Sequence, residues 1–257
     1  MKNISYLVIL LTVSLFFSCQ NSPSTQEVIK VGVSADYPPF VNKDKFGQFE
    51  GMEVDFAFAL AAELDCRVEF VEKEFQDLLP ALERGEFDIA MAGLAPSESR
   101  KKKFTFIKPY MEVDQMALVR REDIAKLKRP GQGHYLKSHY KWGMIATSEV
   151  EERFSKVLQP AQMRSYKDLQ DGLLALRNKE IVGFVCDAPV IWDYARKEPF
   201  SDITGFYWGI YKEQMSWAVA RPSAFSQRLN SIVNKWHQNG TIPNIIKRWS
   251  PYRIEFK

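Results

Sequence analysis

The chain is poor in the residues that build metal centres and disulfide frameworks. Its 257 residues include only three cysteines and three histidines. The histidines form no HExxH pattern and no cysteine has a metal-like partner nearby, so we expect neither a metal site nor a cofactor. Basic and acidic side chains number 35 and 32, and this balance excludes the basic footprint of a nucleic-acid-binding protein.

Apolar runs long enough to cross a bilayer are also lacking. The most apolar segment, Ile4 to Ser18, has fifteen residues, whereas a membrane-spanning helix needs about 20. Because it follows Lys2 and is short, the segment is typical of an export signal.

The end of this segment resembles a bacterial lipobox. It reads Phe16-Phe17-Ser18-Cys19, a small residue followed by a cysteine. Residues 1–18 are therefore predicted to be a signal peptide, and Cys19 to become the acylated first residue that anchors the chain to a membrane. An ordinary signal peptide cut nearby is the alternative. Residues 19–27 have no hydrophobic residue after Cys19 and are predicted to be a flexible tether.

The rest of the chain has the composition of a packed α/β protein. Hydrophobic residues make up 46% of the sequence, enough for a core. Strand and helix patterns alternate in both halves, which favours a parallel sheet covered by helices. The first half is predicted to contain strands at 28–33, 67–71 and 87–92 and helices at 53–64 and 77–84. The second is predicted to contain strands at 141–146, 161–166 and 181–186 and helices at 149–158, 167–177, 222–236 and 243–249.

Two residues bear on the helix predicted at 77–84. Gly85 follows it, at a position where glycine commonly adopts the left-handed conformation. Pro80 lies within it, and we expect the helix to tolerate this proline only in its first turn.

Several short motifs occur in the order and spacing of one family, from residue 28 to residue 250. They are Val31-Gly32-Val33, Tyr37-Pro38-Pro39-Phe40, Gly51-Met52-Glu53-Val54-Asp55, Leu78-Leu79-Pro80-Ala81-Leu82, Phe87-Asp88-Ile89-Ala90, Ala92-Gly93 before Arg100, Pro109-Tyr110, Asp187-Ala188-Pro189 and Asn239-Gly240-Thr241. In these motifs the chain resembles family 3 of the bacterial extracellular solute-binding proteins, the polar amino-acid receptors of ABC importers.

The resemblance implies a two-lobed α/β fold, the type II periplasmic-binding-protein fold, with a ligand cleft between lobes joined by two hinge strands. The first lobe is expected to comprise residues 28–112 and 217–257, and the second residues 113–216. Cys66 and Cys186 then lie in different lobes and are expected to be free. We expect a monomer whose lobes close around the ligand by hinge motion.

The charged groups of an amino acid define the first two site residues. A buried carboxylate and a buried ammonium each need a counter-charge. By the resemblance, Arg100 binds the ligand carboxylate from the first turn of a helix that Ser97 is expected to cap, and Asp187 binds the ammonium. Outside a site, Arg100 would be an exposed helix residue and Asp187 a residue that caps a loop.

Further residues complete the expected site. By the resemblance, Tyr37 and Phe75 sandwich the ligand side chain, although Phe75 could equally be a core residue. Thr147 and Ser148 present hydroxyl groups to the carboxylate, and Gly93 also belongs to the site.

Three departures from the family pattern affect the expected ligand. Ala95 replaces a serine or threonine whose hydroxyl contacts the charged end of the ligand, and the loop before Thr147 is one residue short. Ser34, also a site residue, stands where many members have an aspartate that contacts the ligand side chain. This last departure favours a neutral or modified amino acid over a cationic one.

The sequence therefore predicts a lipid-anchored binding protein of the cell envelope, in the periplasm or at the cell surface. It would capture an amino acid or a similar solute for the permease subunits of an ABC importer, without enzymatic activity. One alternative is a dehydratase of cyclic acids on the same fold, which needs a general acid; the motif positions offer only Asp187. The other is a ligand-sensing partner of a membrane receptor.

Overall fold

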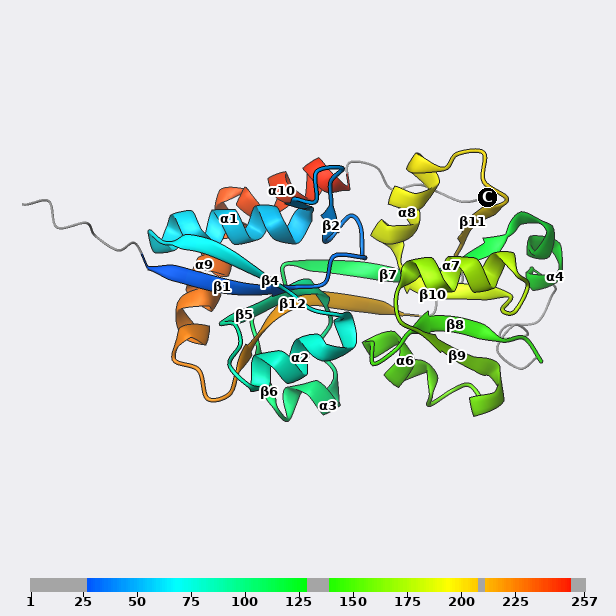
Figure 1. Cartoon of the computed structure of the whole chain (residues 1–257), viewed down its shortest axis with the longest axis horizontal. Helices are drawn as coiled ribbons and strands as arrows, with labels where there is room; N and C mark the ends of the chain where they lie inside the picture. Colours follow the sequence, from blue (N-terminus) through cyan, green and yellow to red (C-terminus); the bar gives the residue numbers. More distant parts are fainter. Residues whose placement is uncertain (1–26, 129–138, 208–210, 251–257) are drawn as a thin grey trace, which may run out of the picture.

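Two long strands run through the middle of the molecule and connect its two ends (Figure 1). They are β7 (Met111–Arg120) and β12 (Lys212–Ala220), and they pair antiparallel over Met111–Asp114 and Lys212–Met215. Beyond this contact β12 pairs with β5 (Ile89–Leu94) and β6 (Phe104–Phe106), whereas β7 pairs with β10 (Gly183–Asp187) and β11 (Ile203–Phe206). With β1 (Val28–Val33), β4 (Arg67–Glu72), β8 (Trp142–Ile145) and β9 (Met163–Tyr166), the strand order is β4-β1-β5-β12-β7-β10-β8-β9.

This computed structural model describes residues 27–128, 139–207 and 211–250. The predicted signal peptide, the predicted lipidation site Cys19 and nearly all of the predicted tether lie outside these residues.

The first group of strands is parallel at its centre and covered by helices on both faces (Figure 1). Its central strand β5 is buried at every residue. Its strands are β1 (Val28–Val33), β4 (Arg67–Glu72), β5 (Ile89–Leu94) and β6 (Phe104–Phe106). Its helices are α1 (Met52–Leu64), α2 (Phe75–Glu83), α3 (Glu98–Lys101), α9 (Phe225–Asn239) and α10 (Thr241–Trp249), and a hairpin of β2 (Asn42–Lys43) and β3 (Phe49–Glu50) precedes α1.

The second group repeats this arrangement, with β8 parallel to both β9 and β10. Its strands are β8 (Trp142–Ile145), β9 (Met163–Tyr166), β10 (Gly183–Asp187) and β11 (Ile203–Phe206). Its helices are α4 (Ile124–Leu127), α6 (Glu149–Phe154), α7 (Leu169–Arg177) and α8 (Ala188–Lys197), with 3-10 turns at Arg121–Asp123 and Pro160–Gln162.

An aromatic cluster fixes the helices of the first group against β12. Phe56 of α1 lies 5.5 Å from Trp217 and 6.1 Å from Trp236 of α9, measured between ring centroids. All three side chains are almost completely buried. Large aromatic groups bury more apolar area than any other residues, so this cluster contributes strongly to joining the last helices of the chain to its first.

The expectation for Pro80 is wrong. Helix α2 begins at Phe75, two residues before the predicted start, so Pro80 lies inside the helix. A proline there leaves the carbonyl of Gln76 without its usual donor. Gln76 is exposed, so water can supply that hydrogen bond.

Other elements differ from the predictions mainly at their ends. Helix α6 ends at Phe154 rather than at residue 158, and β9 is preceded by a 3-10 turn. Gly85 has the expected positive φ, of 74°. Cys66 and Cys186 are both free and buried, which confirms that prediction.

Candidate functional site

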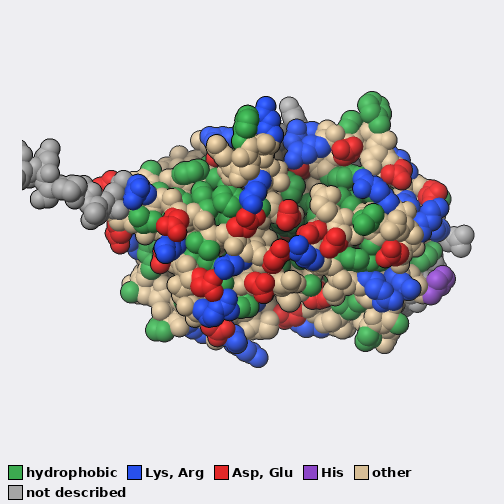
Figure 2. Space-filling view, viewed as in Figure 1, with side chains coloured by type: hydrophobic (Ala, Val, Ile, Leu, Met, Phe, Trp, Pro, Cys, Tyr) green, Lys and Arg blue, Asp and Glu red, His purple; other side chains and the backbone are tan. Residues whose placement is uncertain are grey.

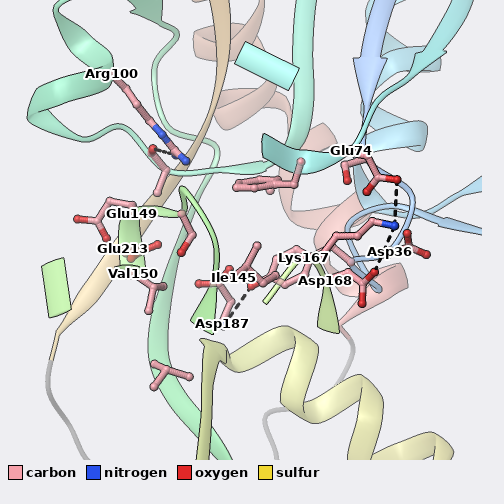
Figure 3. Close-up of a pocket in the computed structure, with 17 residues that line it drawn as sticks. Asp36, Glu74, Arg100, Ile145, Glu149, Val150, Lys167, Asp168, Asp187 and Glu213 are labelled. Atoms are coloured by element: carbon pink, nitrogen blue, oxygen red, sulfur yellow. Dashed lines mark hydrogen bonds and ion pairs between the residues drawn. The ribbon is translucent and has the colours of Figure 1, made fainter. Parts of the chain in front are cut away.

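A pocket lies between the two groups of strands (Figure 3). The empty space within its outline, open solvent at its mouth included, is about 620 Å³. Seven of the eight predicted ligand residues line it: Ser34, Tyr37, Phe75, Gly93, Arg100, Ser148 and Asp187. Thr147 is not among its lining residues. The structure therefore brings the predicted residues together, and their individual roles remain predictions.

Asp187 lies at the end of β10, where a parallel strand meets the pocket. It is almost fully buried, and the hydroxyl of Tyr37 donates a hydrogen bond to its carboxylate at 2.6 Å. The side-chain amide of Gln115 also donates to it. Burial raises the pKa of Asp187 to about 6, although these two hydrogen bonds oppose the shift. Asp187 precedes α8 but its side chain makes no capping bond, so capping does not explain this carboxylate.

Arg100 lies across the pocket from Asp187, on the short helix α3. Ser97 caps this helix as expected, accepting the N–H of Arg100 at 3.3 Å. The guanidinium is buried rather than exposed, 5.7 Å from the ring of Phe75. It donates to the carbonyl oxygens of Ala95 and Thr147, each at 2.7 Å. Two of its N–H groups are therefore already bonded to protein acceptors.

The loop before α6 explains why Thr147 does not line the pocket. Thr147 has a φ of 60°, which is rare and strained for a β-branched residue. Its backbone N–H donates to the carboxylate of Glu151 at 2.6 Å, and the hydroxyl of Ser148 accepts the N–H of Glu151 at 3.1 Å. The backbone N–H of Thr147 and the hydroxyl of Ser148 are thus both bonded to Glu151 in the first turn of α6, and Ser148 still lines the pocket.

Sequence reasoning missed two buried carboxyl groups beside Arg100. Glu149 is the first residue of α6, and its Oε1 accepts two hydrogen bonds from Arg153, at 2.6 and 2.9 Å. Glu213 belongs to β12 and accepts the hydroxyl of Tyr211 at 3.1 Å. Burial, its contact with Glu149 and the charge of Asp187 raise the pKa of Glu213 well above its ordinary value. Glu149 directly follows Thr147 and Ser148, which were predicted to belong to the site. This adjacency was the one sequence signal that could have indicated Glu149.

A second acidic group lies at the other end of the pocket (Figure 3). Lys167 forms an ion pair with Glu74 at 3.1 Å and lies 4.0 Å from Asp168. Burial, followed by the charges of Asp168 and Glu74, raises the pKa of Asp36. Asp36 lies between β1 and β2, Glu74 directly precedes α2, and Lys167 and Asp168 precede α7, so the sequence separates them widely.

The lining of the pocket is strongly acidic. Six carboxyl side chains and two cationic ones line it, and Figure 2 shows acidic side chains gathered at the junction of the two strand groups. This balance favours a cationic ligand and argues against the neutral ligand that Ser34 favoured.

A buried carboxyl group behind the pocket supports Gly93. Glu53 accepts the backbone N–H of Gly93 at 2.9 Å, the hydroxyl of Tyr110 at 2.7 Å and the indole N–H of Trp217 at 2.7 Å. Tyr110 directly precedes β7 and Trp217 lies in β12. Glu53 therefore connects the pocket wall to both strands that join the two ends of the molecule.

Two other kinds of feature are absent from residues 27–128, 139–207 and 211–250. Those residues contain no group of three side chains suited to hold a metal ion. None of their helices is long and apolar enough to span a membrane.

Two α/β lobes, two crossing strands and a polar pocket between them define a bilobal solute-binding protein. The chain belongs to the bacterial extracellular solute-binding proteins, family 3, whose family model matches residues 29–252. The type II periplasmic-binding-protein fold predicted from the sequence is confirmed by solved structures. The predicted residue bounds of the lobes remain a prediction.

Curated relatives are binding proteins by name. The chain is 28% identical to the arginine-binding periplasmic protein of Mannheimia haemolytica over 194 residues, 75% of this chain and 76% of the relative. It is 26% identical to a probable histidine-binding protein of Neisseria gonorrhoeae over 233 residues, 87% of this chain and 83% of the relative.

Solved structures with a similar fold also include amino acid-binding proteins. The ancestral amino acid-binding protein AncCDT-1, a precursor of cyclohexadienyl dehydratase, superposes with a TM-score of 0.78 and 28% identity, covering 87% of this chain and 95% of that one. An ancestral arginine-binding protein bound to arginine superposes with a TM-score of 0.76 and 26% identity, covering 87% and 98%.

Proposed function

We propose that this protein captures a small, positively charged solute of the amino-acid type outside the cytoplasm and delivers it to an ABC importer. The observation that carries the proposal is the buried Asp187 in an acidic pocket with aromatic walls. Family membership supports the transport role, and the names of the curated relatives support capture rather than turnover.

The pocket suggests a role for each group. Asp187 would accept hydrogen bonds from a ligand ammonium, because a buried cation requires a counter-charge. Tyr37 and Phe75 would flank the ligand chain, since aromatic faces attract both alkyl groups and cations. Arg100, with Ser148 beside it, is the group that would meet a carboxylate if the solute carries one.

A thermal-shift screen tests the function directly. The full chain, purified in mild detergent, would be heated with amino acids and with related amines. A ligand at 100 times its dissociation constant should raise the free energy of unfolding by about 2.7 kcal/mol. If no basic amino acid or amine raises the melting temperature, the proposed function is wrong.

We also propose that Cys19 carries a lipid anchor. The support is the apolar segment Ile4 to Ser18 and the small residue that precedes Cys19. Replacing Cys19 with Ser should release the protein from the membrane fraction and remove the acyl mass from the intact protein. The buried Cys66→Ala variant is the control and should remain membrane-bound. An unmodified native chain would contradict the proposal.

A further inference from the structure

We propose that Glu149 and Glu213 share a single proton, and that this proton lets Arg100 accept a ligand carboxylate beside two acidic side chains. The inference rests on the proposed function and assigns a positioning role to two residues of the same pocket. Both side chains line the pocket and are almost fully buried. Figure 3 shows them next to each other, on the side of the pocket where Arg100 lies.

The fold brings the two carboxyl groups into contact from distant parts of the chain. Glu149 is the first residue of α6, and Glu213 is the second residue of β12. The neighbours of Glu213 in β12, Lys212 and Gln214, are exposed, so the alternation of the strand directs the Glu213 side chain inward. There it is in hydrogen-bonding contact with the Glu149 side chain. An ionised carboxylate can only accept hydrogen bonds, so a bond between the two groups requires a proton on one of them.

The hydrogen bonds around the pair leave one oxygen without a donor. Oε1 of Glu149 accepts two N–H groups of Arg153, and Oε1 of Glu213 accepts the hydroxyl of Tyr211 at 3.1 Å. Oε2 of Glu149 is buried and has no donor among the described residues. Buried polar atoms are almost always paired, and a proton on Glu213 would supply the missing donor. Burial and then the contact with Glu149 raise the pKa of Glu213 well above its ordinary value, which favours this protonated form.

The charged groups that face the pair balance when it holds one proton. Arg100 of α3 and Arg153 of α6 face it with positive charge, and Asp187 of β10 faces it with negative charge. Glu152 also acts on Arg100, but it forms an ion pair with Lys156. Two ionised carboxyl groups in contact would add an uncompensated charge to a buried site, which is costly. With one proton, two guanidinium groups face two negative charges, and an amino acid, which adds one α-carboxylate and one α-ammonium, leaves this balance unchanged.

Arg100 keeps the capacity to bind a carboxylate. A guanidinium has five N–H groups, and within the described part of the chain Arg100 donates two hydrogen bonds, to the carbonyl oxygens of Ala95 and Thr147. The hydroxyl of Ser148 accepts a helix N–H and can still donate its own O–H. A fully ionised pair would repel a carboxylate at this position, whereas a pair with one proton carries a single negative charge. The shared proton therefore determines that this end of the pocket accepts a carboxylate.

Infrared spectroscopy of the full chain in detergent tests the shared proton. A protonated carboxyl group has a C=O stretch that is separate from the bands of an ionised carboxylate. The spectrum of the native protein at pH 7 minus that of Glu213→Gln should contain this stretch, while the signals of Glu53 and Asp187, present in both proteins, cancel. The band should be present without ligand and should persist with bound L-arginine. A difference spectrum that contains the bands of an ionised carboxylate instead would overturn the inference.

Calorimetry with L-arginine, or with L-lysine if arginine does not bind, tests the consequence for binding. Glu213→Ala leaves Oε2 of Glu149 without a donor and should weaken binding by about tenfold or more. Glu213→Gln should restore the affinity to within about threefold of the native value, because its amide N–H can donate in place of the shared proton. Glu112→Gln is the control on β7, where Glu112 pairs with Lys212 at the surface, and it should bind like the native protein. Circular dichroism would establish that the variants are folded.

The results separate this inference from the proposed function. If Glu213→Gln binds as weakly as Glu213→Ala, Glu213 acts through a negative charge, and the inference is wrong while the proposed function stands. Native affinity in Glu213→Ala would also overturn it. If neither basic amino acid binds at millimolar concentration, the proposed function fails for solutes that carry a carboxylate. The role of the proton in binding then fails with it, even where the infrared band shows that the proton is shared.

Discussion

Glu53 is a buried carboxyl group that accepts hydrogen bonds around the pocket wall and also has a raised pKa. Its three donors tie it to the pocket wall and to both crossing strands, yet its complete burial raises its pKa to about 7. The hydrogen bonds oppose this shift, so desolvation outweighs them. The glutamate side chain reaches all three partners.

The pKa of Glu53 predicts how stability depends on pH. The unfolded chain releases this proton near pH 4.5, whereas the folded protein retains it up to about pH 7. The folded state therefore binds more protons within this window, and the free energy of unfolding should fall as pH rises through it, by about 1.4 kcal/mol per pH unit for one proton. Glu53→Gln, which stays neutral, should lose this part of the slope.

Urea unfolding at several pH values between 5 and 8 measures the effect. Asp187, whose pKa is raised to about 6, adds a similar slope at the lower end, and the Glu53→Gln variant retains it. The exposed Glu98→Gln variant should follow the native protein. Equal slopes in the native protein and in Glu53→Gln would show that Glu53 is already ionised at pH 5.

At the scale of helices and strands, local patterns were sufficient where one face of an element is buried. The spacing of apolar residues predicted α1 to within one residue because its buried positions follow the helical period. The predicted start of α2 was wrong because the rule that excludes proline from a helix interior considers only hydrogen bonds within the helix. Gln76 is exposed, so water can bond to its carbonyl, which lowers the free-energy cost of Pro80. The shortness of α6 has no counterpart in the sequence pattern, which continues to Leu158.

The end of β5 makes a prediction about the pocket wall. Gly93 has a φ of 61°, and a Cβ there would lie 3.1 Å from the ring of Phe40 and 3.3 Å from that of Tyr37. Gly93→Ala should therefore displace Tyr37 and weaken ligand binding about tenfold, or about 1.4 kcal/mol.

The matched control is Gly85→Ala. Gly85 has a φ of 74° with nothing within 4 Å of the added Cβ. Both variants should lose about 1–2 kcal/mol of stability from the backbone alone, but only Gly93→Ala should lose affinity. Calorimetry and urea unfolding separate the two effects. An unchanged affinity in Gly93→Ala would mean that the wall at Tyr37 does not touch the ligand.

At the scale of the whole molecule, the site was predictable only in part. The motif positions identified Asp187, Tyr37 and Arg100, which the fold brings to one pocket. They did not identify Glu149 and Glu213, because these residues meet only where β12 returns beside the second group of strands. The charge of the pocket, and with it the class of ligand, therefore depends on long-range pairing that local patterns do not contain.

Contacts between residues that line the pocket join its two sides and bear on how ligand binding changes the shape of the protein. Tyr37 bonds to Asp187, Arg100 bonds to Thr147, and Glu74 pairs with Lys167 at 3.1 Å. Each contact joins a residue of the predicted first lobe, 28–112 and 217–257, to one of the predicted second lobe, 113–216. These contacts form without a ligand, and a ligand that touches both lobes would favour the closed arrangement further through the additional contacts that it makes with both.

Small-angle scattering with and without a validated ligand tests this closure. The radius of gyration of the native protein should fall on binding, and the forward scattering should correspond to a monomer. Asp187→Ala removes both a cross-pocket hydrogen bond and the proposed ammonium partner, a loss of about 2–5 kcal/mol for a desolvated charge. At the same ligand concentration this variant should therefore compact less, whereas Asp202→Ala, at an exposed position outside the pocket lining, should compact like the native protein. The native protein could bind the ligand tightly, be open without it and keep the same radius of gyration with it. That result would exclude closure as the change by which the importer recognises the loaded protein.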